Sequence, residues 1–487
     1  MSEEKKESTE FTGIRSIFWP IYSFELKKFL PMAFMMMGIL FNYSILRGTK
    51  DSLVVTNMGA ETIPTLKLWF VLPAAVLFMI VYSKLSNLFS KNKVFYIVVS
   101  FFVAYFALFG MILYPLHDVL MPDWLSGMES EFWKSLVRPI QGWVFSSFYV
   151  MAELWGSAMV SLMFWRFAND VTSIKQSKRF YAMFGFIANA ALIVSGGVLK
   201  AVKDVTLVSF LALFTALIIM GLYYWLNEYV LTDPRFFNPD EIKKPKKKVK
   251  LSLGDSMKYI LTSKYLGFIV LLVVCYGVSI NLVEVTWKDQ VKLLCPTKEA
   301  FSAFMGSLQI WTGIGTIFFM LVGANILRRC TWFTAAMITP LMIFVTGLIF
   351  FGCIIFKDVL DPIVSSCCSL TILEMIAYVG LIQNVLAKGV KYSLFDPTKE
   401  MSYIPLDDEL KSKGKAAVDV IGGRAGKSGG ALINFLLLNV FFVGSTLAQL
   451  APIISGIFVL IMLAWFYAVH GLNIEFLKIT GQQGQKE

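Results

Sequence analysis

The sequence predicts an all-α membrane protein of twelve transmembrane helices, arranged as two halves of six. The composition is the first observation behind this fold class: 57% of the 487 residues are hydrophobic and 16% are charged, whereas a soluble protein carries about 25% charged residues. The second is the grouping of apolar residues into twelve segments, most of them near the ~20 residues that a spanning helix needs. The third is the concentration of Lys and Arg in alternate loops.

We expect one helix from each apolar segment. The approximate ranges are 29–46, 66–90, 94–114, 140–165, 180–199, 206–229, 264–285, 300–323, 331–356, 363–387, 416–443 and 449–469. The segment 416–443 has the weakest signal, because its start, AAVDVIGGRAGKSGG, consists mainly of small and charged residues. The other segments are apolar through most of their length, which excludes a soluble globule for most of the chain.

The distribution of positive charge predicts the orientation of these helices. Of the 44 Lys and Arg residues, 33 fall in the two termini and in every second loop, and 11 fall in the remaining loops. Cytoplasmic loops carry the excess of Lys and Arg, so we expect both termini to be cytoplasmic. The start, MSEEKKESTE, is polar and lacks the apolar core of a signal peptide.

A long basic loop between the sixth and seventh segments divides the chain. It contains KKPKKKVK, and a solvated linker at the cytoplasmic face accounts for these lysines without a nucleic-acid partner. We therefore predict a cytoplasmic N-terminal segment, a six-helix half, a basic linker, a second six-helix half and a cytoplasmic tail, at residues 1–28, 29–230, 231–263, 264–470 and 471–487.

The two halves also resemble each other weakly in sequence. The first segment ends in FNYSILRGTKD and the seventh in INLVEVTWKD. A duplicated six-helix unit, with three-helix repeats inside each half, is how transporters of the major facilitator type are built. In that architecture helices 1, 4, 7 and 10 line a central cavity.

Glu153 is the one charged residue in the stretch from Ile140 to Trp165. Such a stretch rises roughly 39 Å as a helix, so it is long enough to cross a bilayer with some tilt. An ionised carboxylate near the midplane costs at least ~2.5 kcal/mol unless a partner or a wet cavity relieves it. A retained charge of this kind predicts that the protein moves something polar through the membrane.

The other unusual polar residues gather on the same four helices. Helix 1 carries Asn42, Arg47, Lys50 and Asp51, helix 7 carries Asn281, Glu284 and Lys288, and helix 10 carries Glu374, Gln383, Asn384, Lys388 and Lys391. We expect the cations of helices 1 and 7 near the outer helix ends, where long side chains reach the interface. Lys67 is interpreted as an interface charge.

Cations in excess of carboxylates predict a cavity that binds an anion carrying hydrogen-bond donors. Arg supplies a planar fork for two phosphate oxygens and Lys a point charge. The candidate phosphate-binding residues are Arg47, Lys50, Lys288, Lys391, Lys399, Arg424 and Lys427. The candidate carboxylate and amide contacts, for binding or gating, are Asp51, Glu153, Asn189, Asn281, Glu284, Gln383 and Asn384. A nucleotide fits both sets, as do other organic phosphates and dicarboxylates, and Asn189 fits a bond between helices equally well.

Other functional classes are poorly supported. The two histidines lie outside the polar cluster and no CxxC spacing occurs, so we predict no metal site, no cofactor and no enzymatic activity. The run VIGGRAGKSGG lacks the first glycine of a phosphate-binding P-loop, because Ile421 stands at that position. An anion channel is a further alternative, although mixed charges inside a duplicated bundle favour a carrier.

The chain resembles the nucleotide transporters, or ATP/ADP translocases, of obligate intracellular bacteria and plastids, from about Pro20 to Leu472. The runs that carry the resemblance include FLPMAFMMMGILFNYSILRGTKDSLVV, FYVMAELWGSAMVSLMFWRFANDVT, YGVSINLVEVTWK and KYSLFDPTKE. The residues important for transport in this family map onto Lys50, Glu153, Glu284 and Lys399. Gly48 departs from the family pattern, in which some members have an acidic residue.

This resemblance implies twelve spans in a bacterial inner membrane and the import of host ATP against ADP, with phosphate as a further possible substrate. From the two-half architecture we also expect alternating access, and we expect a monomeric carrier. We expect the empty carrier to resist switching because unneutralised cations face its cavity. Proton-coupled import, or a broader substrate range that includes other nucleotides or NAD, remains open, and so does the choice of base.

Overall fold

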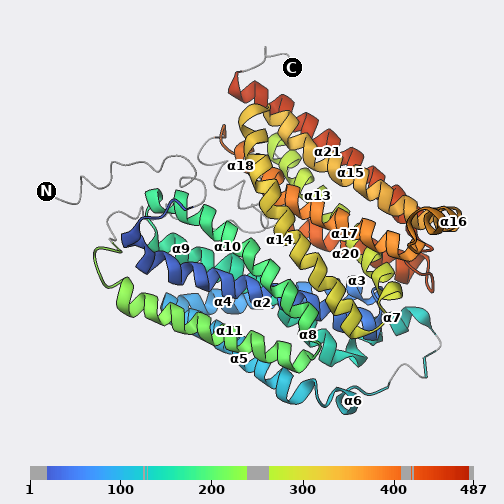
Figure 1. Ribbon diagram of the computed structural model, residues 1–487, viewed down its shortest axis with the longest axis horizontal. Coiled ribbons are helices and arrows are strands. Elements are labelled where there is room, and N and C mark those ends of the chain that lie inside the picture. Colours follow the sequence, from blue (N-terminus) through green and yellow to red (C-terminus); the bar gives the residue numbers. More distant parts are fainter. Residues whose placement is uncertain are drawn as a thin grey trace.

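The computed structural model describes residues 19–123, 127–128, 130–237, 263–406, 418 and 422–481. The ordered elements in these ranges are helices, several of which contain a π-helical turn (labelled η) that continues the same rod. The helices form two groups, one on each side of the basic linker, which lie next to each other in Figure 1, the first in blue to green and the second in yellow to red.

The N-terminal group contains six long rods. They are α2 (Leu26–Met58), α3–η3–α4 (Thr62–Leu66, Lys67–Val71 and Leu72–Leu88), α5–η4 (Lys91–Leu108 and Phe109–Leu113), α8–η5–α9 (Trp143–Trp155, Gly156–Phe164 and Trp165–Val171), α10 (Ile174–Ala201) and α11–η6 (Val205–Trp225 and Leu226–Val230). The 3-10 turn η2 (Ser23–Glu25) precedes α2, and the short helices α6 (His117–Leu120) and α7 (Glu131–Gln141) connect the third and fourth rods.

The C-terminal group repeats this arrangement. Its rods are α13 (Lys264–Leu294), α14 (Lys298–Arg329), α15 (Trp332–Ile355), α17–η8–α18 (Ile372–Val390, Lys391–Phe395 and Asp396–Ser402), α20–η10 (Gly423–Leu436 and Leu437–Phe441) and α21 (Ala451–Thr480). The short α16 (Lys357–Cys368) connects the third and fourth rods, as α6 and α7 do in the first group.

Side-chain caps define several helix starts. Ser173, Ser263, Thr297, Thr331 and Thr371 each accept a hydrogen bond from a backbone N–H in the first turn that follows. These bonds satisfy N–H groups that have no partner within the helix. The boundaries of α10, α13, α14, α15 and α17 are therefore encoded locally.

Eleven helices in the described residues are long and apolar enough to cross a membrane. They coincide with eleven of the twelve expected segments. The protein is therefore a multi-pass membrane protein. The expected segment 416–443 corresponds to a shorter apolar helix, Ser428–Phe441, and part of its start lies outside the described residues. A twelfth span, the division into halves at the stated boundaries and cytoplasmic termini stay predictions.

The helix ends differ from the expected ones where polar residues interrupt the apolar pattern. The expectation that Arg47, Lys50 and Lys288 lie near helix ends was wrong: α2 continues to Met58 and α13 to Leu294. Local hydropathy falls at these residues, but their charges are paired inside the protein, so the helix does not need to end there. The tail expected from residue 471 begins inside α21, which runs to Thr480, and its start stays a prediction.

The expected tenth segment also began too early. Residues 363–368 belong to α16, and α17 begins at Ile372 after the cap Thr371. Glu374 completes this cap, because its Oε2 accepts a hydrogen bond from the Thr371 backbone N–H at 2.8 Å. The Glu374 carboxylate thus caps the start of α17 and does not face a cavity. This differs from the sequence-based expectation, which groups it with the cavity residues of helix 10.

The two groups make their closest backbone contact between α10 and α14. A Cβ on Gly196 would lie 2.5 Å from the Gly306 carbonyl oxygen, and a Cβ on Gly306 would lie 2.6 Å from that of Gly196. Gly313 approaches the Asn189 backbone in the same way. Small residues let membrane helices approach closely, and these glycines fix where the two groups meet.

Two side-chain bonds between the groups lie at the end of the bundle remote from the termini. The Ser52 hydroxyl donates to the Lys298 carbonyl oxygen at 2.9 Å, and Lys298 Nζ donates to the Tyr114 hydroxyl at 2.6 Å. Toward the termini, Lys28 Nζ bonds to the Phe236 carbonyl and the Tyr265 hydroxyl bonds to the Ser402 carbonyl, each within its own group. The bonds of Ser52 and Tyr114 to Lys298 hold the two groups together at the remote end, and in this sense we call that end closed.

Candidate functional site

A run of polar residues lies inside α2, in the middle of the bundle. The side chains of Lys50 and Asp51 are 4% and 3% exposed, although both are charged. Asn42, two turns earlier, donates to the Ala212 carbonyl at 2.8 Å and so ties α2 to α11. Asn42 therefore has a structural role, whereas the charged residues later in α2 contact other helices.

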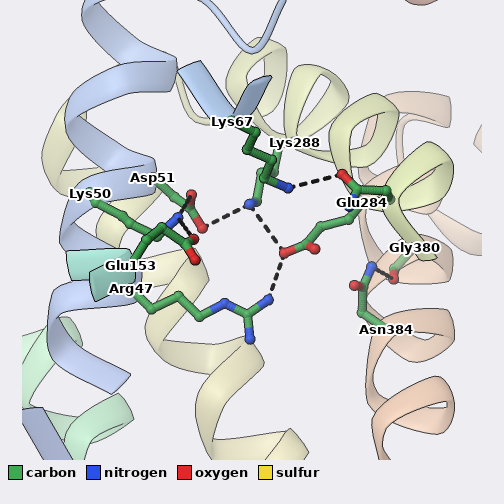
Figure 2. A network of polar contacts seen from close by, with 10 residues as sticks. Arg47, Lys50, Asp51, Lys67, Glu153, Glu284, Lys288, Gly380 and Asn384 are labelled. Carbon is green, nitrogen blue, oxygen red and sulfur yellow. Dashed lines mark hydrogen bonds and ion pairs between the residues drawn. The ribbon is translucent and has the colours of Figure 1, made fainter. Parts of the chain in front are cut away.

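Lys50 and Asp51 begin a chain of ion pairs that crosses from one group to the other (Figure 2). Lys50 Nζ lies 3.0 Å from Glu153 Oε1 on α8 and 2.9 Å from Asp51 Oδ1. The other oxygen of Asp51, Oδ2, lies 2.8 Å from Lys288 Nζ on α13. A single carboxylate therefore bridges two lysines that belong to different helix groups.

The chain continues along α13 and returns to α2. Lys288 Nζ lies 3.1 Å from Glu284 Oε1, one turn earlier on the same helix. The same oxygen lies 2.7 Å from Arg47 Nη2, on α2. We call these six side chains the ion-pair chain: Glu153, Lys50, Asp51, Lys288, Glu284 and Arg47. Their charges alternate in sign, and three cations balance three carboxylates.

Each ion in this chain depends on its neighbours. Moving a carboxylate or ammonium out of water costs several kcal/mol, and removing one member of a buried pair typically costs about 3–5 kcal/mol because the other stays buried and unpaired. The Tyr149 ring adds a further contact, since Lys50 Nζ lies 3.7 Å from its centroid. The chain therefore joins the two helix groups through interactions that are costly to break one at a time.

Lys67 lies next to the ion-pair chain and is not an interface charge, so that expectation was wrong. The π-helical turn η3 ends just before Pro73, which lacks the N–H donor that a regular helix would use. Lys67 begins this turn, and its Nζ donates to Asn281 Oδ1 on α13 at 2.9 Å. Asn281 is thus brought to the site, as the sequence predicted, through a partner that the sequence did not reveal.

Helix α17 contributes amides and one lysine. Asn384 Nδ2 donates to the Gly380 carbonyl of its own helix at 2.9 Å, so this donor is already used (Figure 2). Gln383 is buried, and neither its Nε2 nor Lys388 Nζ has a hydrogen-bond partner among the residues that the structure describes. The charges that act on Lys388 are those of Arg47, Glu284, Lys288 and Asp51, which places it beside the ion-pair chain.

Several predicted site residues lie apart from this cluster. Asn189 donates to the Gly185 carbonyl of its own helix at 2.9 Å, and its Nδ2 also lies 3.9 Å from Met320 Sδ on α14, so it takes part in a contact between helices. Lys391 pairs with Asp396 at 3.4 Å, and Lys399 lies 3.6 Å from Glu400. Arg424 and Lys427 belong to α20 by their backbone, and their side chains lie outside what the structure describes.

Sequence reasoning missed Lys67 and Tyr149 as neighbours of the charged cluster. Lys67 stands at the start of an apolar segment, where an interface lysine has the same local sequence. Tyr149 lies one turn before Glu153 on α8, and this spacing places both on one helix face. That spacing is a usable signal for Tyr149, whereas no signal in the sequence indicates the partner of Lys67.

A cavity of about 360 Å³ lies elsewhere in the N-terminal group, between α5, α9 and η6. Its lining includes Lys91 and Asp170, which already pair with each other at 2.7 Å, and Arg166, which donates to the Tyr82 hydroxyl at 2.6 Å. None of the ion-pair chain lines this cavity, so we assign the functional site to the ion-pair chain and its neighbours.

Comparison with known proteins gives one consistent result. Residues 4–476 match the family described as TLC ATP/ADP transporter. The chain is 48% identical over 495 residues to ADP,ATP carrier protein 1 of Rickettsia prowazekii (strain Madrid E), with 98% of each chain covered. It is 46% identical over 498 residues to ADP,ATP carrier protein 1 of Chlamydia muridarum (strain MoPn / Nigg), covering 98% of this chain and 93% of the relative.

The solved nucleoside transporter NupG is similar in fold. The TM-score is 0.57, the overlap covers 91% of this chain and 99% of that one, and the sequence identity is 11%. At this identity the likeness shows the fold alone, which is that of a known membrane transporter.

Proposed function

Because the chain belongs to the TLC ATP/ADP transporter family, we propose that it carries ATP across a membrane in exchange for ADP, with the ion-pair chain as the core of its substrate site. The observation that carries this proposal is the ion pair between Asp51 and Lys288, which joins the two helix groups inside the bundle. A phosphate oxygen can take the place of a carboxylate beside a lysine or an arginine. A nucleotide can therefore compete for the ions that hold the two groups together.

In an alternating-access cycle, this competition would release the contacts that keep the two helix groups in one conformation. The remote end of the bundle is closed, and with cytoplasmic termini it is the outer end. Reopening it requires Asp51 and Lys288, and also Glu284 and Arg47, to separate. In the empty carrier this separation leaves buried charges unpaired, whereas bound phosphates supply new partners. Exchange follows, because the carrier switches with a nucleotide bound and resists switching without one.

This account differs from the sequence expectation in one respect. We expected unneutralised cations to make the empty carrier reluctant to switch. The cations of the ion-pair chain are instead each within ion-pair distance of a carboxylate. The proposed reluctance therefore comes from attraction between the two helix groups, and not from repulsion among cations.

We further propose the finer features that the family resemblance implies. The protein crosses the membrane twelve times as two six-helix halves, has cytoplasmic termini, lies in a bacterial inner membrane and acts as a monomer. It takes up ATP from the outer side, releases ADP, transports phosphate as an additional substrate and has no enzymatic activity. Cysteine labelling of single loops from each side of the membrane tests the topology.

Uptake of labelled ATP into proteoliposomes tests the proposed function. Uptake into vesicles preloaded with ADP, and little uptake into empty vesicles, is the expected result. Uptake into empty vesicles that grows with an imposed proton gradient would replace exchange with proton-coupled import. Competition by unlabelled GTP, CTP, UTP, NAD and phosphate then defines the substrate range, and equal competition by all nucleotides would favour the alternative of a broader nucleotide transporter.

A further inference from the structure

We propose that Lys67 and Lys388 are the two cations that first bind the phosphate chain of the nucleotide, one from each helix group. This inference rests on the proposed function and adds two residues to its binding site. The six ions of the ion-pair chain keep the role proposed above and hold the helix groups together until the phosphates arrive.

Lys388 is the first observation behind this inference. Its Nζ is shielded from water, and no described residue provides a hydrogen-bond acceptor for it. A buried charge without a partner is costly, and such groups inside a membrane protein usually mark a substrate path. Gln383 Nε2, on the same helix, is a second buried donor without an acceptor. Two unused donors on α17 suit a ligand rich in acceptors, which is the chemistry of a polyphosphate.

Lys67 is the second observation. Its Nζ bonds to Asn281 Oδ1, a neutral amide oxygen, at 2.9 Å. An amide orients the ammonium group without neutralising its charge. Among the described residues, no carboxylate lies within ion-pair distance of Lys67. Lys67 is thus held in position by a neutral partner.

The balance of charge separates these two lysines from the other cations. Arg47, Lys50 and Lys288 each lie within 3.1 Å of at least one carboxylate oxygen. Lys391 also has a carboxylate partner, Asp396. The ion-pair chain is neutral as a whole, and Lys67 and Lys388 are lysines next to it that have no described carboxylate within ion-pair distance. An entering polyanion is attracted by net charge, and a neutral chain provides none.

The placement of the two lysines suits the coupling of binding to movement. Lys67 belongs to η3 in the N-terminal group and Lys388 to α17 in the C-terminal group. The charges of both act on Glu284, the member of the ion-pair chain that contacts Arg47. Phosphates held by both lysines are therefore next to the Glu284–Arg47 pair, where they compete with Glu284 for Arg47.

Substitution by Met tests the inference, because Met keeps the length of Lys and removes the charge. Lys67→Met and Lys388→Met are compared with Lys84→Met, which changes an exposed lysine on α4. In proteoliposomes we expect each of the first two variants to raise the KM for ATP about tenfold or more, as for a lost charge-assisted hydrogen bond. Lys84→Met leaves the KM unchanged.

Thermal unfolding in detergent supplies a readout that is independent of transport. ATP, ADP and inorganic pyrophosphate are the ligands, and the rise in Tm that each causes is measured. In Lys67→Met and Lys388→Met the rise shrinks for all three, while the Tm of the empty Lys388→Met protein stays equal or increases, because an unpaired buried charge is gone. Lys388→Arg keeps the charge and recovers part of the ligand response.

The outcomes separate this inference from the proposed function. An unchanged KM together with an unchanged rise in Tm in both Met variants overturns the role of these lysines. Wild-type protein that exchanges neither ATP nor ADP overturns the proposed function instead, and the pyrophosphate response then decides alone whether the two lysines bind phosphate. A large loss of Tm in the empty Lys388→Met protein would show a structural role and would also overturn the inference.

Discussion

Asp51 and Lys288 join the two helix groups through an ion pair of 2.8 Å, with both side chains almost completely buried at 3% and 2% exposure. Asp51 lies on α2 and Lys288 on α13, and each also pairs within its own group, with Lys50 and Glu284. The pair is therefore the central link of a longer chain. Its separation is a necessary part of any movement that opens the bundle at its remote end.

Replacing Asp51 by Asn should weaken this link and loosen the coupling between the two substrates. Loss of one member of a buried pair costs about 3–5 kcal/mol, so we expect a lower Tm for Asp51→Asn. We also expect more ATP uptake into empty vesicles, relative to vesicles preloaded with ADP. The ratio of these two uptake rates is the measurement.

The double variant Asp51→Asn/Lys288→Met is the control for this prediction. It removes both charges, and replacement of a whole buried pair is often neutral or stabilising. Recovery of the Tm but not of strict exchange is expected. A ratio equal to that of the wild type in Asp51→Asn would contradict a role of the pair in coupling.

Replacing Lys50 by Ala should reduce ATP uptake sharply and leave the protein in the membrane. Lys50 connects Glu153, Asp51 and the Tyr149 ring, so its loss leaves Glu153 and one oxygen of Asp51 without this cation. We expect at least a tenfold decrease, on the scale of one charge-assisted hydrogen bond. Uptake per amount of membrane protein is measured, and uptake like that of the wild type would exclude Lys50 from the substrate site.

Replacing Tyr114 by Phe should destabilise the closed remote end. The Tyr114 hydroxyl accepts from Lys298 Nζ at 2.6 Å, across the two helix groups. A hydrogen bond to a charged group is worth about 1.5–3 kcal/mol, so the open population should increase by roughly tenfold or more. The labelling rate of a cysteine placed at the buried Gln290, in a background without native cysteines, reports this opening.

The Tyr105→Phe variant provides a matched control for this experiment. Tyr105 bonds to Ser147, within the N-terminal group, at 2.9 Å. Its loss should leave the labelling rate at Gln290 unchanged. Equal labelling in Tyr114→Phe and in wild type would show that the Lys298 bond does not hold the remote end closed.

Replacing Gly196 by Ala should lower the stability of the contact between α10 and α14. The new Cβ would lie 2.5 Å from a backbone oxygen of α14, and backbone cannot move aside as a side chain can. We expect a decrease in Tm of several degrees, because overpacking typically costs about 1–3 kcal/mol. Gly197→Ala, at the next position, meets nothing within 4 Å and should leave the Tm equal or higher. A Tm unchanged in both variants would contradict this contact.

The helices and the location of the site could be predicted from the sequence to a large extent. Eleven expected apolar segments coincide with eleven long apolar helices. The ion-pair chain brings together polar residues of helices 1, 4 and 7, as α2, α8 and α13. Lys388 of helix 10, on α17, lies beside it. That these residues line a shared cavity stays a prediction.

By itself, the sequence determined what depends on local hydropathy and composition: the membrane-spanning helices, the charged residues inside them and the family to which they belong. Only the tertiary structure decided which charges pair. Arg47 and Glu284 are 237 positions apart in the chain, and no local pattern relates them. Their contact depends on the packing of α2 against α13, as the contact of Lys67 with Asn281 does.

The same reason explains the errors at Glu374 and at the helix ends. The local sequence around a charged residue at the edge of an apolar segment is the same whether that residue is solvated, caps a helix or pairs with a distant ion. The free energy that separates these outcomes comes from partners on other helices, and the tertiary structure alone places those partners.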